Sequence, residues 1–236
     1  MVTVEPKKIR NLIAILKLKG YVVKERPFEL NIVGVRNDST VPNKFDDFIY
    51  VFWKDDKGNW QGKYYTATTD AGTYWLLNPM SNLGAALLKE GQYKNSHKIG
   101  LHKGQYKALV QQNPVTVIRD YDRNAVLDFN NGREETGIFG INTHRAGASG
   151  NTVDVGKWSA GCQVFQNADD FANFLELAEK SSKLYGNNFT YTLIDERALN
   201  RRTKRYGAFV IGGIIVLAGL YTAYRAYKNL PLIPKM

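Results

Sequence analysis

Cys162 is the only cysteine of this 236-residue chain, and His144 lies upstream at a spacing that can bring it back across a sheet to the sulfur. A lone cysteine cannot form an intrachain disulfide, and one cysteine with three histidines is a poor zinc-binding set. Cys162 is therefore a buried small hydrophobic residue or a nucleophile. Gly161 lets the backbone approach a bound substrate closely, which favours the nucleophile.

The chemistry of such a pair is acyl transfer. A thiol with an ordinary pKa of about 8.5 is mostly protonated at neutral pH, and a histidine in hydrogen-bond reach can take the proton to leave a thiolate–imidazolium pair. Attack on an amide carbonyl gives a thioester, and the oxyanion that precedes it needs N–H donors. We expect Cys162 as nucleophile, His144 as base and then acid, and the backbone amides of Gly161 and Cys162 as the oxyanion hole.

The residues around this pair form a longer pattern. It runs Thr136-Gly137-Ile138-Phe139-Gly140-Ile141, then His144, then 14 residues, then Ser159-Ala160-Gly161-Cys162. This pattern resembles the catalytic core of the L,D-transpeptidases, which are cysteine enzymes of bacterial cell-wall metabolism, and indicates a divergent, phage-type member. The resemblance covers about residues 115–195. It implies an α+β domain that acts on peptidoglycan stem peptides.

Two positions depart from the family pattern. Ala160 stands where the family has a histidine, and Val164 stands where an arginine often contacts a substrate carboxylate. Arg145 is the candidate to replace that charge, and Trp158 and Ala160 are the other expected substrate contacts. In the family a backbone carbonyl often orients the catalytic imidazole. Ser159 is our candidate for this role, through its carbonyl or its hydroxyl.

The charge of the chain is concentrated at its C-terminal end. The net charge is +10, but residues 201–236 hold seven basic and no acidic residues, which leaves about +3 for residues 1–200. The basic residues flank an uncharged segment of 19 residues, 206–224, that would span about 28 Å as a helix. This distribution argues against a nucleic-acid partner.

Residues 206–227 are therefore predicted to be a transmembrane anchor that contacts lipid, preceded by a basic linker at 197–205. A buried core helix is the alternative, and charges on both flanks leave the orientation open. Glycines in the segment permit helix–helix association, so a homo-oligomer or virion partners stay open. Lys17 and Lys19 make the N-terminal apolar run too short for a signal peptide, and residues 1–20 are predicted to be an amphipathic helix.

Residues 21–196 are predicted to form the catalytic domain, an α+β fold dominated by antiparallel strands. We expect strands at 28–35, 48–53, 60–68, 138–143 and 189–194, and a hairpin of 114–120 with 125–129. A helical turn is expected at 83–88. A helix with an N-cap at Asn167 is expected to end at Gly186.

Residues 120–124 are similar to the start of a calcium-binding loop, with Asp120, Asp122 and Asn124 at alternate positions. Ala125 replaces the glycine expected at the sixth position, and Asn131 stands where a bidentate glutamate belongs. The sequence therefore favours a plain hairpin turn, and we expect no metal and no cofactor. His97 and His102 are expected to be surface or wall residues.

Together these features predict a membrane-anchored cysteine enzyme that transfers or hydrolyses peptidoglycan stem peptides. Since peptidoglycan lies outside the cytoplasmic membrane, we expect either the bacterial envelope or the internal membrane of a phage virion, where the protein would be a lytic enzyme. The alternative is a non-catalytic, membrane-tethered structural or wall-binding protein. In that case Cys162 is an inert core thiol and His144 a structural histidine.

Overall fold

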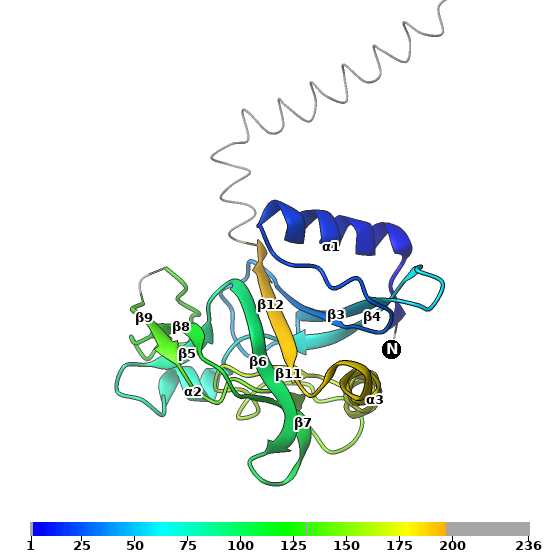
Figure 1. The fold of residues 1–236 in the computed structure, drawn as a ribbon. Helices are drawn as coiled ribbons and strands as arrows, with labels where there is room; N and C mark the ends of the chain where they lie inside the picture. Colours follow the sequence, from blue (N-terminus) through cyan, green and yellow to red (C-terminus); the bar gives the residue numbers. More distant parts are fainter. Residues whose placement is uncertain (1, 131, 197–236) are drawn as a thin grey trace, which may run out of the picture. The chain divides into compact units, whose positions relative to one another are not determined.

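A nine-stranded sheet forms the centre of the fold (Figure 1). Its strand order is β1-β4-β11-β10-β7-β6-β12-β2-β3, and a further pairing of β3 with β4 joins eight of the strands into a closed ring. The strands are β1 (Val2–Thr3), β2 (Asn31–Arg36), β3 (Asp47–Lys54), β4 (Trp60–Thr68), β6 (Gly91–His102), β7 (Tyr106–Gln111), β10 (Thr143–Arg145), β11 (Gln163–Phe165) and β12 (Phe189–Asp195).

The computed structural model describes residues 2–130 and 132–196. Most neighbouring strands pair antiparallel; β10 with β11 and β12 with β2 are the parallel pairs among the strands described. The predicted α+β fold with mainly antiparallel strands is thus confirmed. The predicted linker (197–205) and anchor (206–227) lie outside the described residues. Within the described part of the chain, no helix has the length and apolar character needed to cross a membrane.

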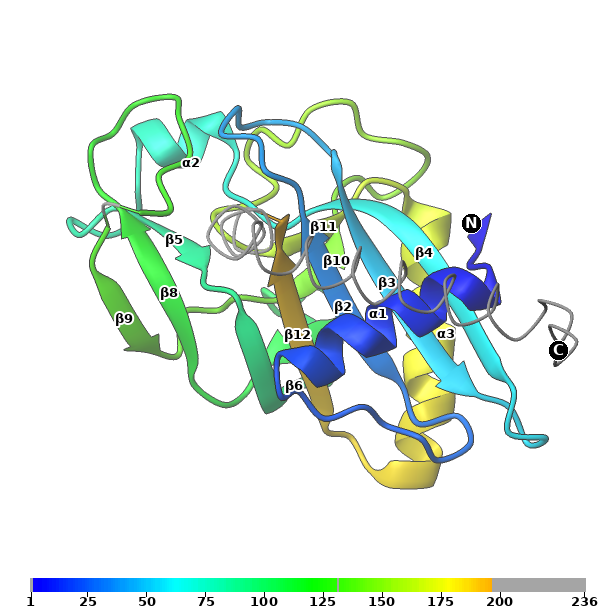
Figure 2. The ribbon, with the colours of Figure 1, turned by 90° about the horizontal axis from the view of Figure 1, so that it is seen from above.

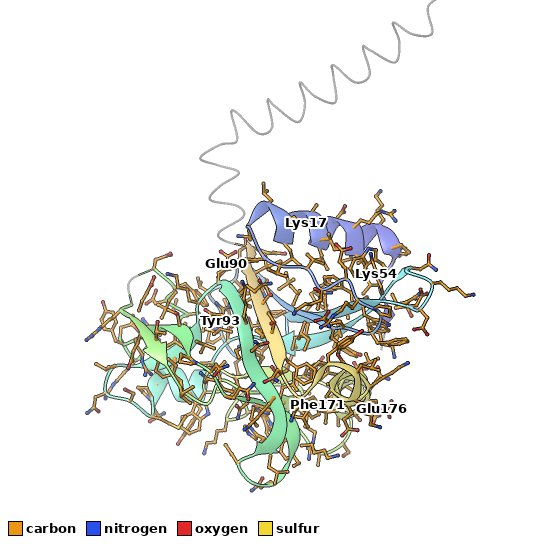
Figure 3. All side chains as sticks on the ribbon, viewed as in Figure 1. Lys17, Lys54, Glu90, Tyr93, Phe171 and Glu176 are labelled. Carbon is orange, nitrogen blue, oxygen red and sulfur yellow. The ribbon has the colours of Figure 1, made fainter. Side chains whose placement is uncertain are left out.

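Two helices cover opposite sides of the β3–β4 hairpin (Figure 1). Helix α3 (Ala168–Tyr185) buries Phe171 and Phe174 in the main core, where both contact Phe165 of β11 and Phe174 also contacts Tyr65 of β4. Figure 3 shows Phe171 on the side of α3 toward the sheet and Glu176 on its outer side. The Asn167 side chain accepts hydrogen bonds from the first-turn amides, so the predicted N-cap is confirmed.

Helix α1 (Pro6–Leu18) confirms the predicted N-terminal amphipathic helix. It buries Ile9, Leu12 and Leu16, and Figure 2 shows it lying across the strands. A Cβ atom at Gly62 of β4 would lie 3.0 Å from the Ile9 side chain, so this glycine lets the helix approach closely. Its apolar face therefore packs on the sheet.

A smaller sheet forms a side lobe next to the ring. It contains β5 (Ala85–Leu88), β8 (Val115–Asp120) and β9 (Glu134–Gly137) in the order β5-β8-β9, with the short helix α2 (Thr73–Leu77) beside it. Leu76, Leu87, Leu127 and Phe129 are buried in its own core. We call these elements and the loops between them the side lobe.

Three local predictions in this region are wrong. Residues 85–88 form strand β5 instead of a helical turn, because a short apolar run buried on both faces has no period that separates strand from helix. Strand β8 pairs with β5 and β9, whereas residues 125–129 form a loop that buries Leu127 and Phe129 in the lobe core. The strand expected at 138–143 is confined to 143–145, because 138–142 cross between the sheets.

Candidate active site

The parallel pairing of β10 and β11 places Cys162 and His144 on neighbouring strands. Thr143 is aligned with Gln163 and His144 with Val164, which places Cys162 directly before β11 and opposite Asn142. Side chains alternate along a strand, so Cys162 and His144 share one face of the sheet. The predicted nucleophile and base are thus two residues apart in register on neighbouring strands.

His144 is buried, and its two ring nitrogens have different environments. Nδ1 lies 2.7 Å from the carbonyl oxygen of Arg145, and Nε2 has no hydrogen-bond partner among the described residues. A carbonyl oxygen can only accept, so Nδ1 carries the proton and Nε2 carries the free lone pair. The fold therefore presents His144 in the tautomer that a general base needs.

Two residues contact His144 that the sequence did not connect with it: Tyr106, for which no role was expected, and His102, which was expected to be a surface or wall residue. The Tyr106 hydroxyl lies 3.2 Å from Nδ1 of His144 and donates to the Arg145 carbonyl, also at 3.2 Å. The ring of His102 stacks on the ring of His144 with centroids 4.0 Å apart. Both residues flank the tight turn that joins β6 to β7, where His102 pairs with Tyr106. His102 is therefore a wall of this site.

Cys162 is partly buried, and its thiol has a specific partner. Sγ donates to the carbonyl oxygen of Gly140 at 3.3 Å. Burial raises the pKa of the Cys162 thiol, although the backbone amide of Asn142 and the charge of Lys103 act in the opposite direction. The thiol is therefore neutral in the resting protein at neutral pH.

The imidazole of His144 is also neutral. Burial lowers the pKa of His144 to about 3, and the neighbouring His102 makes the second-largest contribution in the same direction. A neutral thiol beside a neutral imidazole differs from the thiolate–imidazolium pair that the sequence suggested. Burial of both groups disfavours that ion pair, because charge is poorly solvated there. For acyl transfer at this pair, the thiol would have to lose its proton during the attack itself.

Ser159 does not orient the imidazole, contrary to the sequence-based expectation. Its hydroxyl donates to the Cys162 carbonyl at 2.8 Å and accepts from the Gly161 amide at 3.1 Å. Its own carbonyl accepts from the Gly72 amide at 2.9 Å. Ser159 therefore shapes the loop that carries the cysteine, and the carbonyl that orients His144 belongs to Arg145.

The predicted oxyanion hole is only half available. The Gly161 N–H is bound to Ser159, whereas the Cys162 N–H donates to no other described residue. Gly161 has a φ of +122°, and a Cβ atom there would lie 1.9 Å from the Ala86 carbonyl oxygen. The glycine is thus required by its contact with β5, and the Cys162 amide is the free donor.

A cavity of about 230 Å³ opens beside the cysteine loop, between that loop and the side lobe. Ala160 lines it, together with Trp75, Met80, Phe139 and the buried Arg119. The guanidinium of Arg119 bonds Glu135 at 2.8 Å and lies over the Phe139 ring. The cation in the cavity wall is therefore Arg119, which no local sequence pattern indicated.

The other two expected substrate contacts lie away from this wall. Arg145 stacks on the Tyr106 ring at 4.3 Å and donates to the Gly147 carbonyl. Trp158 lies on the cysteine loop with 46% of its surface exposed. Neither residue lines the cavity. Arg145 thus lies next to His144, and Trp158 is exposed on the loop that carries Cys162.

His97 is fully buried, so the expectation of a surface or wall residue is wrong for it. Its Nε2 lies 2.8 Å from the Ile141 carbonyl, and its Nδ1 lies 2.8 Å from the Ser96 hydroxyl. Burial lowers the pKa of His97 to about 4. His97 therefore fixes the segment that leads into β10 and carries His144.

Comparisons with known proteins add no relative. No family model, no curated protein and no solved structure matches the chain.

Proposed function

We propose that this chain is a cysteine enzyme of the L,D-transpeptidase type, which acts on peptidoglycan stem peptides through a thioester. The observation that carries the proposal is the unpartnered, buried Nε2 of His144 on the sheet face shared with Cys162. A buried polar atom without a partner is unfavourable, and functional sites are where such atoms are retained. The sequence pattern around both residues supports the same reaction.

The first half-reaction uses three groups. The Cys162 thiol turns from the Gly140 carbonyl toward Nε2 of His144, which takes its proton while Sγ forms a bond to the peptide carbonyl carbon. The backbone N–H of Cys162 donates to the oxyanion. The imidazolium then protonates the leaving amine as the carbon–nitrogen bond breaks, which leaves a thioester and a neutral histidine.

The acceptor decides the outcome of the second half-reaction. An amine that attacks the thioester gives a new amide and therefore a cross-link. Water gives a free carboxylate and therefore cleavage. In both cases His144 removes the acceptor proton and returns it to the thiolate of Cys162, so the enzyme needs neither metal nor cofactor for this chemistry.

The cavity beside Ala160 is the proposed site for the donor peptide. Stem peptides carry free carboxylates, and the guanidinium of Arg119 is a matched partner in geometry and charge. Glu135, which now neutralises Arg119, has 36% of its side chain exposed and can turn away into solvent. We propose that Arg119 takes the role that Val164 cannot perform.

We further propose that residues 206–227 anchor the enzyme to a membrane, either in the bacterial envelope or inside a phage virion, where it would open the wall during infection. The basic flanks and uncharged core of this segment support the anchor. Detection of the protein in purified virus particles would support the virion location. Its presence only in uninfected envelopes would contradict that location.

The deciding experiment incubates the full-length chain in mild detergent with purified peptidoglycan and identifies the products by mass spectrometry. Cys162→Ala and His144→Ala are the test variants, and Lys98→Ala, at an exposed position of β6, is the matched control. Cleaved or rejoined stem peptides that disappear in both test variants and persist in the control establish the enzyme. Unchanged peptidoglycan with folded protein and several wall types would favour the tethered structural or wall-binding protein.

A further inference from the structure

Three aspartates of the side lobe converge at the end of β8. Asp120 is the last residue of that strand, and Asp122 and Asp128 belong to the loop that follows. One carboxylate oxygen from each residue lies within 4.8 Å of the others. These residues lie in the segment whose sequence is similar to the start of a calcium-binding loop but favours a plain turn.

Asp120 supplies a second and independent observation. The residue has no exposed surface, and its Oδ1 is buried without a hydrogen-bond partner. Its other oxygen accepts from the Asp128 amide at 3.0 Å. A buried carboxylate oxygen with no donor is costly unless a cation or a proton compensates it.

The three carboxylates lack an ion-pair partner among the described residues. None of the three carboxylates forms an ion pair with a lysine or arginine within 4 Å in the part of the chain that the structure describes. Asp120 is buried, and its carboxylate lies close to those of Asp122 and Asp128. Three acidic groups are thus brought together in an arrangement that their own repulsion opposes.

The geometry suits a hard divalent cation. Calcium is bound by oxygen ligands at about 2.3–2.6 Å, so two ligands of one ion lie at most about 5 Å apart. The 4.8 Å limit on the three carboxylates satisfies this condition. No histidine or cysteine belongs to the cluster, which disfavours zinc.

The absence of a glycine at the sixth position does not prevent the loop from turning. The residue with positive φ in this loop is Arg123, at +56°. The chain therefore reverses direction two residues earlier than in the family of loops to which the sequence was compared. Asp122 also accepts the Asn124 side-chain amide at 2.6 Å, which fixes its carboxylate near the other two.

We propose that Asp120, Asp122 and Asp128 bind one calcium ion, with water and backbone oxygens completing its coordination. The ion would fasten the loop 121–128 to the end of β8. That loop buries Leu127 in the side-lobe core, and the Leu127 amide donates to the Thr40 carbonyl at 2.9 Å. The ion is therefore structural, and this proposal does not depend on the proposed enzymatic function.

The site also adjoins the cavity. Asp120 follows Arg119 in β8 and pairs with Ala85 of β5, and both neighbours line the cavity wall. A Cβ atom at Gly84 would lie 1.9 Å from the Asp120 carbonyl oxygen, so the backbone before β5 directly contacts the backbone at the end of β8. Calcium binding would thus order the wall opposite the cysteine loop.

Terbium luminescence tests the site directly. Terbium replaces calcium, and Tyr121, the exposed residue between two proposed ligands, can sensitise its emission. We expect saturable emission from the full-length chain in detergent, displaced by calcium. Asp122→Asn and Asp128→Asn should weaken binding at least about 10-fold. Asp56→Asn, an exposed aspartate of the β3–β4 turn, is the matched control and should bind normally.

Thermal unfolding gives a readout that is independent of fluorescence. Calcium at about 100 times its Kd should raise Tm by about 5–10 °C in the unmodified chain and in Asp56→Asn. The exposed Asp122 should be replaceable without unfolding, which keeps the test valid if Asp120→Asn does not fold. Equal terbium emission in all variants, or no shift of Tm at millimolar calcium, would overturn the proposal. Binding of magnesium but not calcium would overturn the assignment of the ion.

Discussion

The rings of His102 and His144 stack with their centroids 4.0 Å apart and their planes 23° from parallel. The side-chain amide of Asn142 lies 3.1 Å from Nδ1 of His102, so this nitrogen accepts and the ring is neutral. Burial lowers the pKa of His102 as well as that of His144. His102 therefore acts as a neutral platform that keeps water and charge away from the proposed base.

His102→Ala should change the titration of His144. Removing the stacked ring admits water, so the pKa of His144 should rise from about 3 toward its ordinary value. We expect a loss of about 10-fold in kcat with little change in KM, against about 10²–10⁴-fold for His144→Ala. The imidazole titration, followed by NMR, is the readout that a purely structural role would not move. His102→Phe, which keeps a stacked ring, should restore most of kcat, and an unchanged titration in His102→Ala would contradict this role.

Alkylation of Cys162 should depend on pH in a specific way. Burial raises the pKa of the thiol, so the rate with iodoacetamide should increase steadily up to at least about pH 9. A preformed thiolate–imidazolium pair would instead react at a nearly constant rate between about pH 5 and 8. Mass spectrometry of the labelled chain over a pH series distinguishes the two. Cys162→Ala is the control for background labelling.

The sequence predicted helices α1 and α3 and the β3–β4 hairpin well because their signals are local, whereas the short helix α2 was not predicted. The N-cap at Asn167, the stop at Gly186 and the turn cluster after β3 each act over a few residues. The sequence also selected His144 and Cys162, because their types and spacing form a pattern. It did not predict strand β5, whose buried run has no distinguishing period.

The missed parts of the site depend on pairings across the fold. His102 and Tyr106 reach His144 only because β7 lies beside β10, and Thr143 pairs with Leu109. Arg119 reaches the cavity only because β8 joins β5 in a separate sheet. The hydrophobic periodicity along the sequence does not predict which distant strands become neighbours. The role expected for Ser159 failed for the same reason, since its carbonyl is bound by Gly72, which is 87 residues away.

Gly161→Ala should destabilise the protein. The residue has a φ of +122°, and the added methyl group would lie 1.9 Å from the backbone oxygen of Ala86. Relief requires movement of either the cysteine loop or β5, so we expect a loss of about 3 kcal/mol in the free energy of unfolding. Urea denaturation measures this loss. Gly150→Ala, at a positive φ with open space around it, is the control for backbone strain alone and should lose less.

Arg119→Gln should weaken substrate binding more than catalysis. If the guanidinium receives a stem-peptide carboxylate, KM should rise at least about 10-fold while kcat changes little. Arg119→Lys keeps the positive charge but lacks the planar guanidinium. Its KM should therefore lie between those of the unmodified chain and Arg119→Gln. Steady-state kinetics with a soluble stem peptide measures both constants. An amidated peptide, which lacks the carboxylate, should be insensitive to either substitution, and equal sensitivity would contradict the assignment.

His97→Gln should reduce the loss of stability in acid. The pKa of buried His97 is lowered to about 4, so between about pH 4 and 6.5 the unfolded chain binds a proton that the folded protein does not. The contribution of His97 to the free energy of unfolding therefore has its full value above about pH 6.5. It falls by about 2–3 kcal/mol on acidification to about pH 4.5. Urea denaturation at both pH values should show a smaller difference in His97→Gln than in the unmodified chain. Ala108→Gly, a buried change without a titratable group, should keep the full difference, and an equal difference in all three proteins would exclude His97 as its source.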